Sequence, residues 1–273
     1  MPVKRSVKTF FTVLLTAVFL FSTGKFLLSQ RDKAEGNSAY EEALQIAASG
    51  KQTSSPAATE VPAPEGESRL VVAPVEEEDP HICTLESMDL GALREVNPDV
   101  VGWILIPDTE INYPLMHSED NNYYLQRTWD QKSNAMGSIF LEYLCSPDLT
   151  DPNTIIYGHN MNDGSMFAGL HKYQQQDYWE AHPYVYILSD YGVYRYGIYS
   201  AYRASTKSNT YGIEFPTETS WLRFLEKALE DSLIDTGVEL QSTDRILTLS
   251  TCTGANRSAR FVIHARLKMT LAS

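Results

Sequence analysis

The chain has 273 residues, which is enough for one domain of ordinary size with additional segments. Acidic residues outnumber basic ones by 35 to 22, and the net charge of −13 argues against nucleic acid as a partner, because phosphates select basic surfaces. Three cysteines are too few for a disulfide framework, although Cys83 and Cys145 could pair in an oxidising compartment, and no Cys/His spacing resembles a zinc site.

Residues 1–29 predict a membrane anchor. Lys4, Arg5 and Lys8 precede an apolar run over residues 10–28, and about 20 such residues suffice to cross the hydrocarbon core. Positive charge before the run predicts a single-pass protein of the cell membrane with its N-terminus inside and the rest of the chain outside. A cleaved signal peptide is the alternative, but no small-x-small cleavage site clearly closes the run.

Residues 30–83 predict a flexible extracellular linker. The stretch 51–80 is rich in Pro, Ala, Ser, Thr and Glu, and such a composition cannot bury enough apolar surface to offset the entropy lost on ordering. Residues 39–48 could form a short helix within the linker. We expect the linker to hold the following domain, residues 84–273, away from the membrane.

The pattern over residues 84–273 predicts a mainly β domain. Apolar, aromatic and β-branched runs separated by turn residues predict strands at 100–106, 111–115, 137–142, 153–157, 184–188, 192–202, 246–252 and 260–267. Short helices are expected at 89–96 and 165–173, and an amphipathic helix at 218–231. Many short strands with an N-terminal helix and few others are typical of a closed β-barrel, here of about eight strands.

His159 is the first candidate functional residue. It leaves the end of the strand Asn153-Thr-Ile-Ile-Tyr-Gly158 and enters a polar turn, so it is placed like a functional group and not like a packed one. An imidazole titrates near neutrality and can give a proton to a leaving amine and take one from an incoming amine. His264 is a minor alternative, because it shares a strand face with Arg260 but lies about 13 Å further along that strand.

Cys252 and Arg260 are the other two candidates, within RILTLSTCTGANRSARFVIHARL at 245–267. Period-two alternation puts Ser250 and Cys252 on one strand face, with Cys252 at the strand end. A thiolate is a nucleophile, and a neighbouring guanidinium lowers the pKa of the thiol and stabilises a developing oxyanion. Arg257 could substitute for Arg260, which we prefer because it begins the apolar strand. Taken alone, Cys252 could also be a small buried hydrophobe.

These motifs, in this order, resemble those of the class B sortases. They are NPDVVGWILIPDTEINYPL at 97–115, YGHNM at 157–161, the single helix before the Cys strand, TLSTC at 248–252 and the Arg on the following strand. The resemblance covers about residues 89–267. Cys252 is followed by Thr253-Gly254, where some class B members have an acidic residue, so a carboxylate helper at that point is not expected.

The resemblance implies a membrane-anchored cysteine transpeptidase on the surface of a Gram-positive-type bacterium, with a sortase-type barrel and no metal or other cofactor. Cys252 would attack the carbonyl of a Thr in a C-terminal sorting motif, His159 would transfer protons, and Arg260 would hold the substrate and stabilise the oxyanion. The partners would be surface proteins or pilins that carry the motif, and an amine of a peptidoglycan precursor or a pilin. Residues expected to contact the sorting peptide are Ser250, Thr251, Asn121, Leu125 and Tyr211.

Two other classes of function remain open from the sequence. A cell-wall thiol peptidase or hydrolase would also use Cys and His, but in the papain-like order Cys precedes His. A catalytically silent surface module could keep the barrel but would not need thiol, imidazole and guanidinium together. The sorting motif, NPxTN-like or (S/P)PxTG-like, and the acceptor amine are not specified by the sequence.

Overall fold

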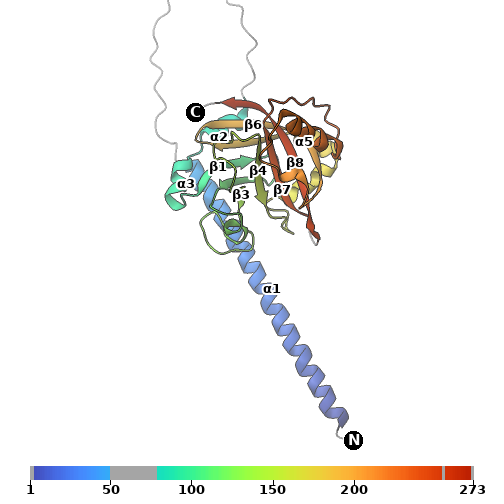
Figure 1. Ribbon diagram of the computed structural model, residues 1–273. Helices are drawn as coiled ribbons and strands as arrows, with labels where there is room; N and C mark the ends of the chain where they lie inside the picture. The colour runs from blue at the N-terminus through green and yellow to red at the C-terminus, as the bar shows by residue number, and fades with distance from the viewer. Residues whose placement is uncertain (1–2, 50–78, 254–255, 272–273) are drawn as a thin grey trace, which may run out of the picture.

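The computed structural model describes residues 3–49, 79–253 and 256–271. Within these residues eight strands form a closed barrel, in the neighbour order β1-β2-β3-β4-β7-β8-β6-β5 (Figure 1). The strands are β1 (Val100–Leu105), β2 (Asn112–Met116), β3 (Ile139–Leu141), β4 (Asn153–Gly158), β5 (Tyr184–Ser189), β6 (Gly192–Ser205), β7 (Ile246–Thr253) and β8 (Asn256–Leu271). The predicted barrel of about eight strands is therefore confirmed.

The helices lie outside the barrel, in the segments of the chain that precede or connect its strands. They are α1 (Val3–Ser49), α2 (Pro80–Glu86), α3 (Leu90–Val96), α4 (Gln176–Ala181) and α5 (Glu218–Glu230), with 3-10 turns η1 (Tyr123–Gln126), η2 (Ala168–Gln174) and η3 (Asn209–Tyr211). Local signals explain their starts: Asp79 and Asp89 cap α2 and α3, and a capping box of Thr217 and Ser220 begins α5.

The strand pairing that matters most for function is parallel. β4 and β7 run side by side in the same direction, with Gly158 opposite Thr251, although residues 159–245 separate them in sequence. Parallel neighbours need a long crossover, and here it contains β5, β6 and α5. The two strand ends that carry the predicted nucleophile and base consequently lie at one edge of the barrel.

The faces of β7 alternate between two apolar clusters. Leu247 and Leu249 belong to the main core inside the barrel, whereas Ile246 belongs to a second cluster under α5. Because side chains alternate along a strand, Ser250 lies on the outer face with Ile246, and Thr251 lies on the inner face with Leu249.

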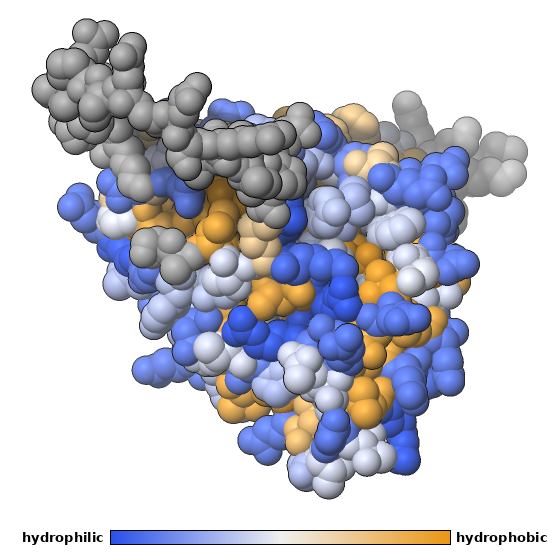
Figure 2. Space-filling model, turned by 90° about the horizontal axis from the view of Figure 1, so that it is seen from above, coloured by the Kyte–Doolittle hydropathy of each residue, from blue (hydrophilic) through white to orange (hydrophobic). Residues whose placement is uncertain are grey.

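Helix α1 is longer than the sequence suggests. It leaves the barrel as a straight rod whose N-terminal end lies far from the strands (Figure 1). Large apolar side chains between Phe10 and Leu28 are exposed, and among the described residues α1 is the one helix long and apolar enough to cross a membrane. The top of the barrel, by contrast, is mainly hydrophilic with scattered apolar patches (Figure 2). This contrast makes α1 a possible membrane anchor.

The predicted linker differs from the structure at both ends. Residues 30–49 continue α1 without a break, and Ala39, Tyr40, Ala43 and Ala47 are buried against the barrel. At the other end, folded structure begins with α2 at Pro80 and not near residue 84. A short helix was expected at 39–48, but its docking was not, because the surface that receives it comes from distant segments. The part of the linker at 50–78 lies outside the described residues.

Cys83 and Cys145 are not joined by a disulfide. Cys83 is exposed on α2, whereas Cys145 is buried. Burial raises the pKa of the Cys145 thiol to about 12, so this cysteine is a packed thiol at neutral pH.

Candidate active site

Two strand pairings bring the predicted catalytic residues to one edge of the barrel. Gly158 pairs with Thr251, and the next residue along each strand is His159 and Cys252 respectively. On the other side of β7, Cys252 pairs directly with Arg260 of the antiparallel β8. Directly opposed residues of antiparallel strands have Cα atoms about 5 Å apart, so thiol and guanidinium come from adjacent positions. The register favours Arg260 over Arg257, which does not oppose Cys252. The side chains of Cys252 and Arg257 lie outside the described residues.

The Arg260 side chain is half-buried at this edge. Its Nη1 donates a hydrogen bond of 3.0 Å to the carbonyl of Ala259. A partly desolvated guanidinium is well suited to bind an oxyanion, because it stays charged and offers several planar donors.

His159 is half-buried and held by a main-chain carbonyl. Its Nε2 lies 2.7 Å from the oxygen of Leu125, at the end of η1. A carbonyl oxygen only accepts, so Nε2 carries a hydrogen, and in the neutral ring Nδ1 is the nitrogen without one. The predicted residue Leu125 thus orients the imidazole through its backbone, while its side chain is exposed.

Gly137 permits this close packing. It has φ +62°, and a Cβ atom there would lie 2.7 Å from the oxygen of Leu125 and 2.8 Å from Cδ2 of His159. Only a residue without a side chain fits both the backbone conformation and the space. Gly137 is therefore part of the support of the histidine.

A polar network covers the outer face of β4 and β7 beside the strand ends. Asn121 Nδ2 donates to both carboxylate oxygens of Glu142 at 2.7 Å, and the Tyr157 hydroxyl donates to Glu142 at 2.8 Å. The Tyr157 and Tyr211 rings lie 6.3 Å apart, and the Tyr211 hydroxyl is 3.0 Å from Oγ of Ser250. Burial, and then the Glu142 charge, raise the pKa of Tyr157, so its hydroxyl stays protonated.

The structure thus brings most of the predicted peptide-contacting residues together. Asn121, Tyr211 and Ser250 belong to this network, whereas Leu125 contacts His159 through its carbonyl oxygen. Thr251 does not join them: like Ser250 it is 1% exposed, but it faces the barrel interior, and its hydroxyl oxygen has no hydrogen-bond partner among the described residues. Alternation along β7 therefore turns Thr251 away from the face on which this network lies.

Sequence reasoning missed Glu142 and Tyr157. Glu142 comes directly after the apolar strand β3, and a carboxylate at a strand end is a usable signal. Tyr157 immediately precedes the Gly158-His159 pair. Its hydroxyl donates to Glu142, and the sequence does not reveal this contact because it forms only in the folded barrel.

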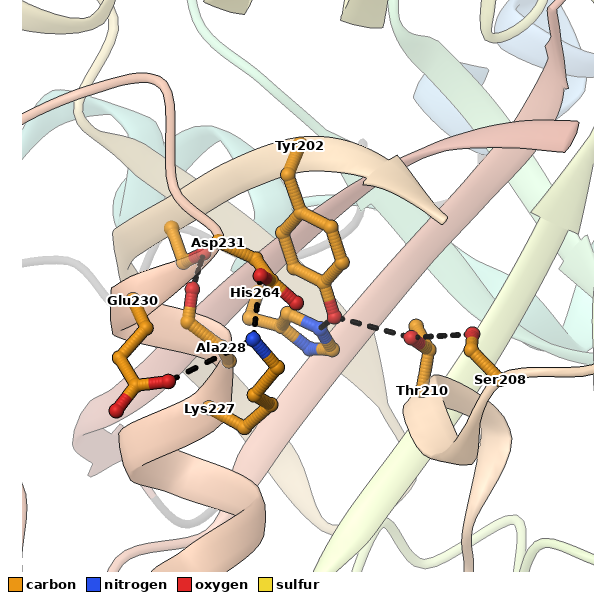
Figure 3. Close-up of polar contacts among 9 residues, drawn as sticks. Tyr202, Ser208, Thr210, Lys227, Ala228, Glu230, Asp231 and His264 are labelled. Carbon is orange, nitrogen blue, oxygen red and sulfur yellow. Dashed lines mark hydrogen bonds and ion pairs between the residues drawn. The ribbon is translucent and has the colours of Figure 1, made fainter. Parts of the chain in front are cut away.

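His264, the minor alternative to His159, is fully buried between the barrel and α5. Its Nδ1 lies 2.8 Å from Oγ1 of Thr248. Its Nε2 lies 2.9 Å from the hydroxyl of Tyr202, as Figure 3 shows. Burial lowers its pKa to about 3, so the ring is neutral at physiological pH. Both nitrogens are committed to structural bonds, which argues against a role in proton transfer to a substrate.

The closed barrel, with the predicted His159, Cys252 and Arg260 together at one edge, is an arrangement suited to an enzyme of thiol-based acyl transfer. A sortase domain model matches residues 104–268. Sortase B of Listeria monocytogenes is 40% identical over 181 residues, which cover 66% of this chain and 74% of that protein. The chain belongs to the sortase family, whose members are cysteine transpeptidases, and its relatives are of class B.

Solved structures agree with this assignment. A Staphylococcus aureus sortase B–substrate complex has a TM-score of 0.63 and 31% identity, covering 70% of this chain and 87% of that one. The structure of sortase B from B. anthracis in complex with AAEK1 has a TM-score of 0.68 and 30% identity, covering 87% of this chain and 98% of that one. The predicted fold and family are confirmed.

Proposed function

We propose that Cys252 is the nucleophile, His159 the general acid and base, and Arg260 the oxyanion-binding residue of this transpeptidase. The Cys252 sulfur attacks the carbonyl carbon of the motif Thr, the peptide bond after Thr breaks, and the leaving amine takes a proton from His159. An acceptor amine then attacks the thioester and gives a proton to His159, and the thiolate departs. Arg260 stabilises the oxyanion in both steps.

The observation that carries this proposal is the double register at β7. On one side of β7, β4 pairs Gly158 with Thr251, so that His159 and Cys252 are the next residues of the two chains. On the other side, β8 puts Arg260 opposite Cys252. Three separate strands thus contribute one reactive group each at the same edge, an arrangement that a purely structural barrel does not require.

The sorting peptide would lie along the outer face of β4 and β7. There the partly exposed Asn121, Tyr157 and Tyr211 are held at defined positions by the buried Glu142 and Ser250. The substrate complex of the Staphylococcus aureus relative supports a peptide-binding role for this chain. The acceptor would be an amine of a peptidoglycan precursor or of a pilin subunit. Because a cysteine thiol would cleave a peptide bond, the enzyme would be classed with the thiol peptidases.

Helix α1 supports a location at the cell membrane. Its exposed apolar part at 10–28 would span the bilayer, and Lys4, Arg5 and Lys8 would stay on the cytoplasmic side. The catalytic domain would then be extracellular, where surface proteins arrive.

A transfer assay tests the proposed function. The full chain in detergent micelles is incubated with peptides containing Thr-Gly or Thr-Asn, with and without an amine acceptor, and products are identified by mass. We expect a Thr–amine product from the native chain and from Cys83→Ser, a control that removes an exposed thiol, and none from Cys252→Ala. Transfer by Cys252→Ala would refute the assignment of the nucleophile, and cleavage that ignores every amine would indicate a hydrolase.

A further inference from the structure

We infer that the C-terminal part of α1, residues 32–47, is a positioning element for His159, and that Tyr40 is the positioning residue. The inference rests on the proposed function, because it matters only if His159 transfers protons. It assigns a catalytic consequence to a segment that the sequence suggests is part of a linker.

The helix is docked on the barrel by polar as well as apolar contacts. Trp129 Nε1 donates to the carbonyl of Ala39 at 2.6 Å, and Asn134 Nδ2 donates to the carbonyl of Asp32 at 2.7 Å. Near the C-terminal end of α1, the backbone N–H of Asp89 donates to Ala47 at 2.9 Å. Side chains on one face of the helix are buried, so residues 32–47 belong to the folded domain.

The first connection to His159 runs through Gly137. The hydroxyl of Tyr40 donates a 2.5 Å hydrogen bond to the Gly137 carbonyl and lies 3.2 Å from Oγ of Ser138. Gly137 packs against the oxygen of Leu125, the same oxygen that holds Nε2 of His159. Tyr40 therefore supports the segment that positions the hydrogen-bond acceptor of the imidazole.

The second connection reaches the loop that follows His159. The ring of Tyr40 meets the ring of Tyr113 edge-on at 5.2 Å, and the Tyr113 hydroxyl accepts a 3.0 Å hydrogen bond from the backbone of Met166. The next residue, Phe167, donates its N–H to the carbonyl of His159 at 2.9 Å. Nearby, Lys33 of α1 lies 3.2 Å from Asp163 of the same loop.

Tyr40 thus touches the supports on both sides of the histidine. Burial raises its pKa well above the ordinary tyrosine value, so the hydroxyl remains a donor at any physiological pH. Displacements of about 1 Å at a catalytic group can reduce turnover strongly, and hence loss of this donor is expected to affect the chemical step more than peptide binding.

The same helix carries the apolar run, so the anchor and the histidine support are mechanically continuous. Leu28 ends the run, and Asp32 makes the first of the docking hydrogen bonds named above four residues later. At 1.5 Å per residue this separation is about 6 Å along the helix axis.

Tyr40→Phe in the full chain tests the inference, with Tyr173→Phe as the matched control. Tyr173 is also buried and also donates to a main-chain carbonyl, that of His182 at 2.8 Å, and its described polar and ring contacts are with His182 and Tyr178 and not with the His159 supports. We expect Tyr40→Phe to lower kcat roughly fivefold to tenfold with KM unchanged, and Tyr173→Phe to leave both unchanged. Thermal unfolding is measured for both variants, and kinetics are recorded well below both transitions.

Two further variants complete the test. Lys33→Met removes the ion pair to Asp163 without touching the core, and we expect it to lower kcat roughly twofold. His159→Ala separates the two hypotheses: if it retains full turnover, the proposed function fails. If His159→Ala is inactive but Tyr40→Phe and Tyr173→Phe have equal effects on kcat, or Tyr40→Phe has none, the positioning role alone is overturned.

Discussion

Two histidines lie on this barrel in different surroundings, and the difference separates the proposed catalytic group from a structural one. His159 is half-buried just beyond the end of β4, and a main-chain carbonyl holds its Nε2. His264 lies in the middle of β8, fully buried, with hydroxyl groups on both nitrogens. A ring held through one nitrogen at a strand end can exchange protons with a substrate, whereas a ring bonded at both nitrogens fixes its neighbours.

The hydrogen bonds around His264 have a consistent direction. Asn153 Nδ2 donates to the carbonyl of Gly212, so its oxygen is free to accept from the Thr248 hydroxyl, which in turn accepts from Nδ1 of His264. Nε2 then accepts from Tyr202. Figure 3 shows that the Tyr202 hydroxyl also makes a hydrogen bond with Thr210 on η3. This cluster therefore anchors the segment from which Tyr211 reaches Ser250, and it indirectly supports the face proposed to contact the peptide.

The largest expected effect distinguishes the two histidines directly. His159→Ala should lower kcat roughly a thousandfold, because general acid and base catalysis is lost. His264→Gln should change kcat less than about threefold at pH 7.5, since an amide can still donate to Thr248 and accept from Tyr202. Steady-state transfer assays on both variants check this, and a collapse of kcat in folded His264→Gln would contradict the comparison.

Arg260→Lys should lower kcat roughly a hundredfold. An ammonium keeps the charge but loses the planar set of donors that can hold a carbonyl oxygen and an oxyanion together. Arg203→Lys on the neighbouring strand β6 is the control, because its guanidinium bonds only Gln174 among the contacts known for it. Equal kinetics for the two variants would show that Arg260 has no special role.

Glu142→Gln should lower kcat/KM about tenfold, mainly through KM. A neutral amide cannot accept from Asn121 and Tyr157 as a carboxylate does, and bonds to a charged acceptor are the stronger ones. The exposed Glu119→Gln serves as the control. An unchanged KM would indicate that the network does not shape the peptide-contacting face.

The smallest effect concerns stability and pH. The pKa of His264 is about 3 in the folded chain and near 6.5 when unfolded, so below pH 6.5 protons bind preferentially to the unfolded state. The free energy of unfolding should therefore fall by about 2 kcal/mol between pH 7.5 and pH 5 from this residue. Denaturant titrations of His264→Gln should show a shallower fall, while the partly exposed control His117→Gln should follow the native slope. Identical slopes for all three would contradict the buried neutral state of His264.

Much of the catalytic edge could be predicted from sequence, and for a physical reason. His159, Cys252 and Arg260 each stand where an apolar, β-branched run meets small polar residues, and strand ends are visible in such a pattern. Ser250 could be assigned to a face because alternation along β7 is local. The same rule places Thr251 on the opposite face, a consequence that the grouping of Thr251 with Ser250 as peptide-contacting residues did not take into account.

The remaining features depend on contacts between distant segments. Tyr40 looks unremarkable in a polar stretch, and its partner Gly137 lies 97 residues away. The role of Glu142 depends on the hydrogen bonds that it accepts from Asn121 and Tyr157, which come from a different loop and a different strand. Local propensity cannot encode such contacts, since they arise only when the barrel closes.

The most direct test of the central claim is the intact mass of the full chain after a short incubation with a sorting peptide and no acceptor amine. The account predicts an acyl adduct on Cys252, located by peptide mapping, that forms in His264→Gln but is lost in Cys252→Ala and strongly slowed in His159→Ala. Subsequent addition of an amine should remove the adduct and release a Thr–amine product. An adduct on Cys83 or Cys145, or one that forms equally fast in His159→Ala, would contradict the assignment of this barrel edge as the active site.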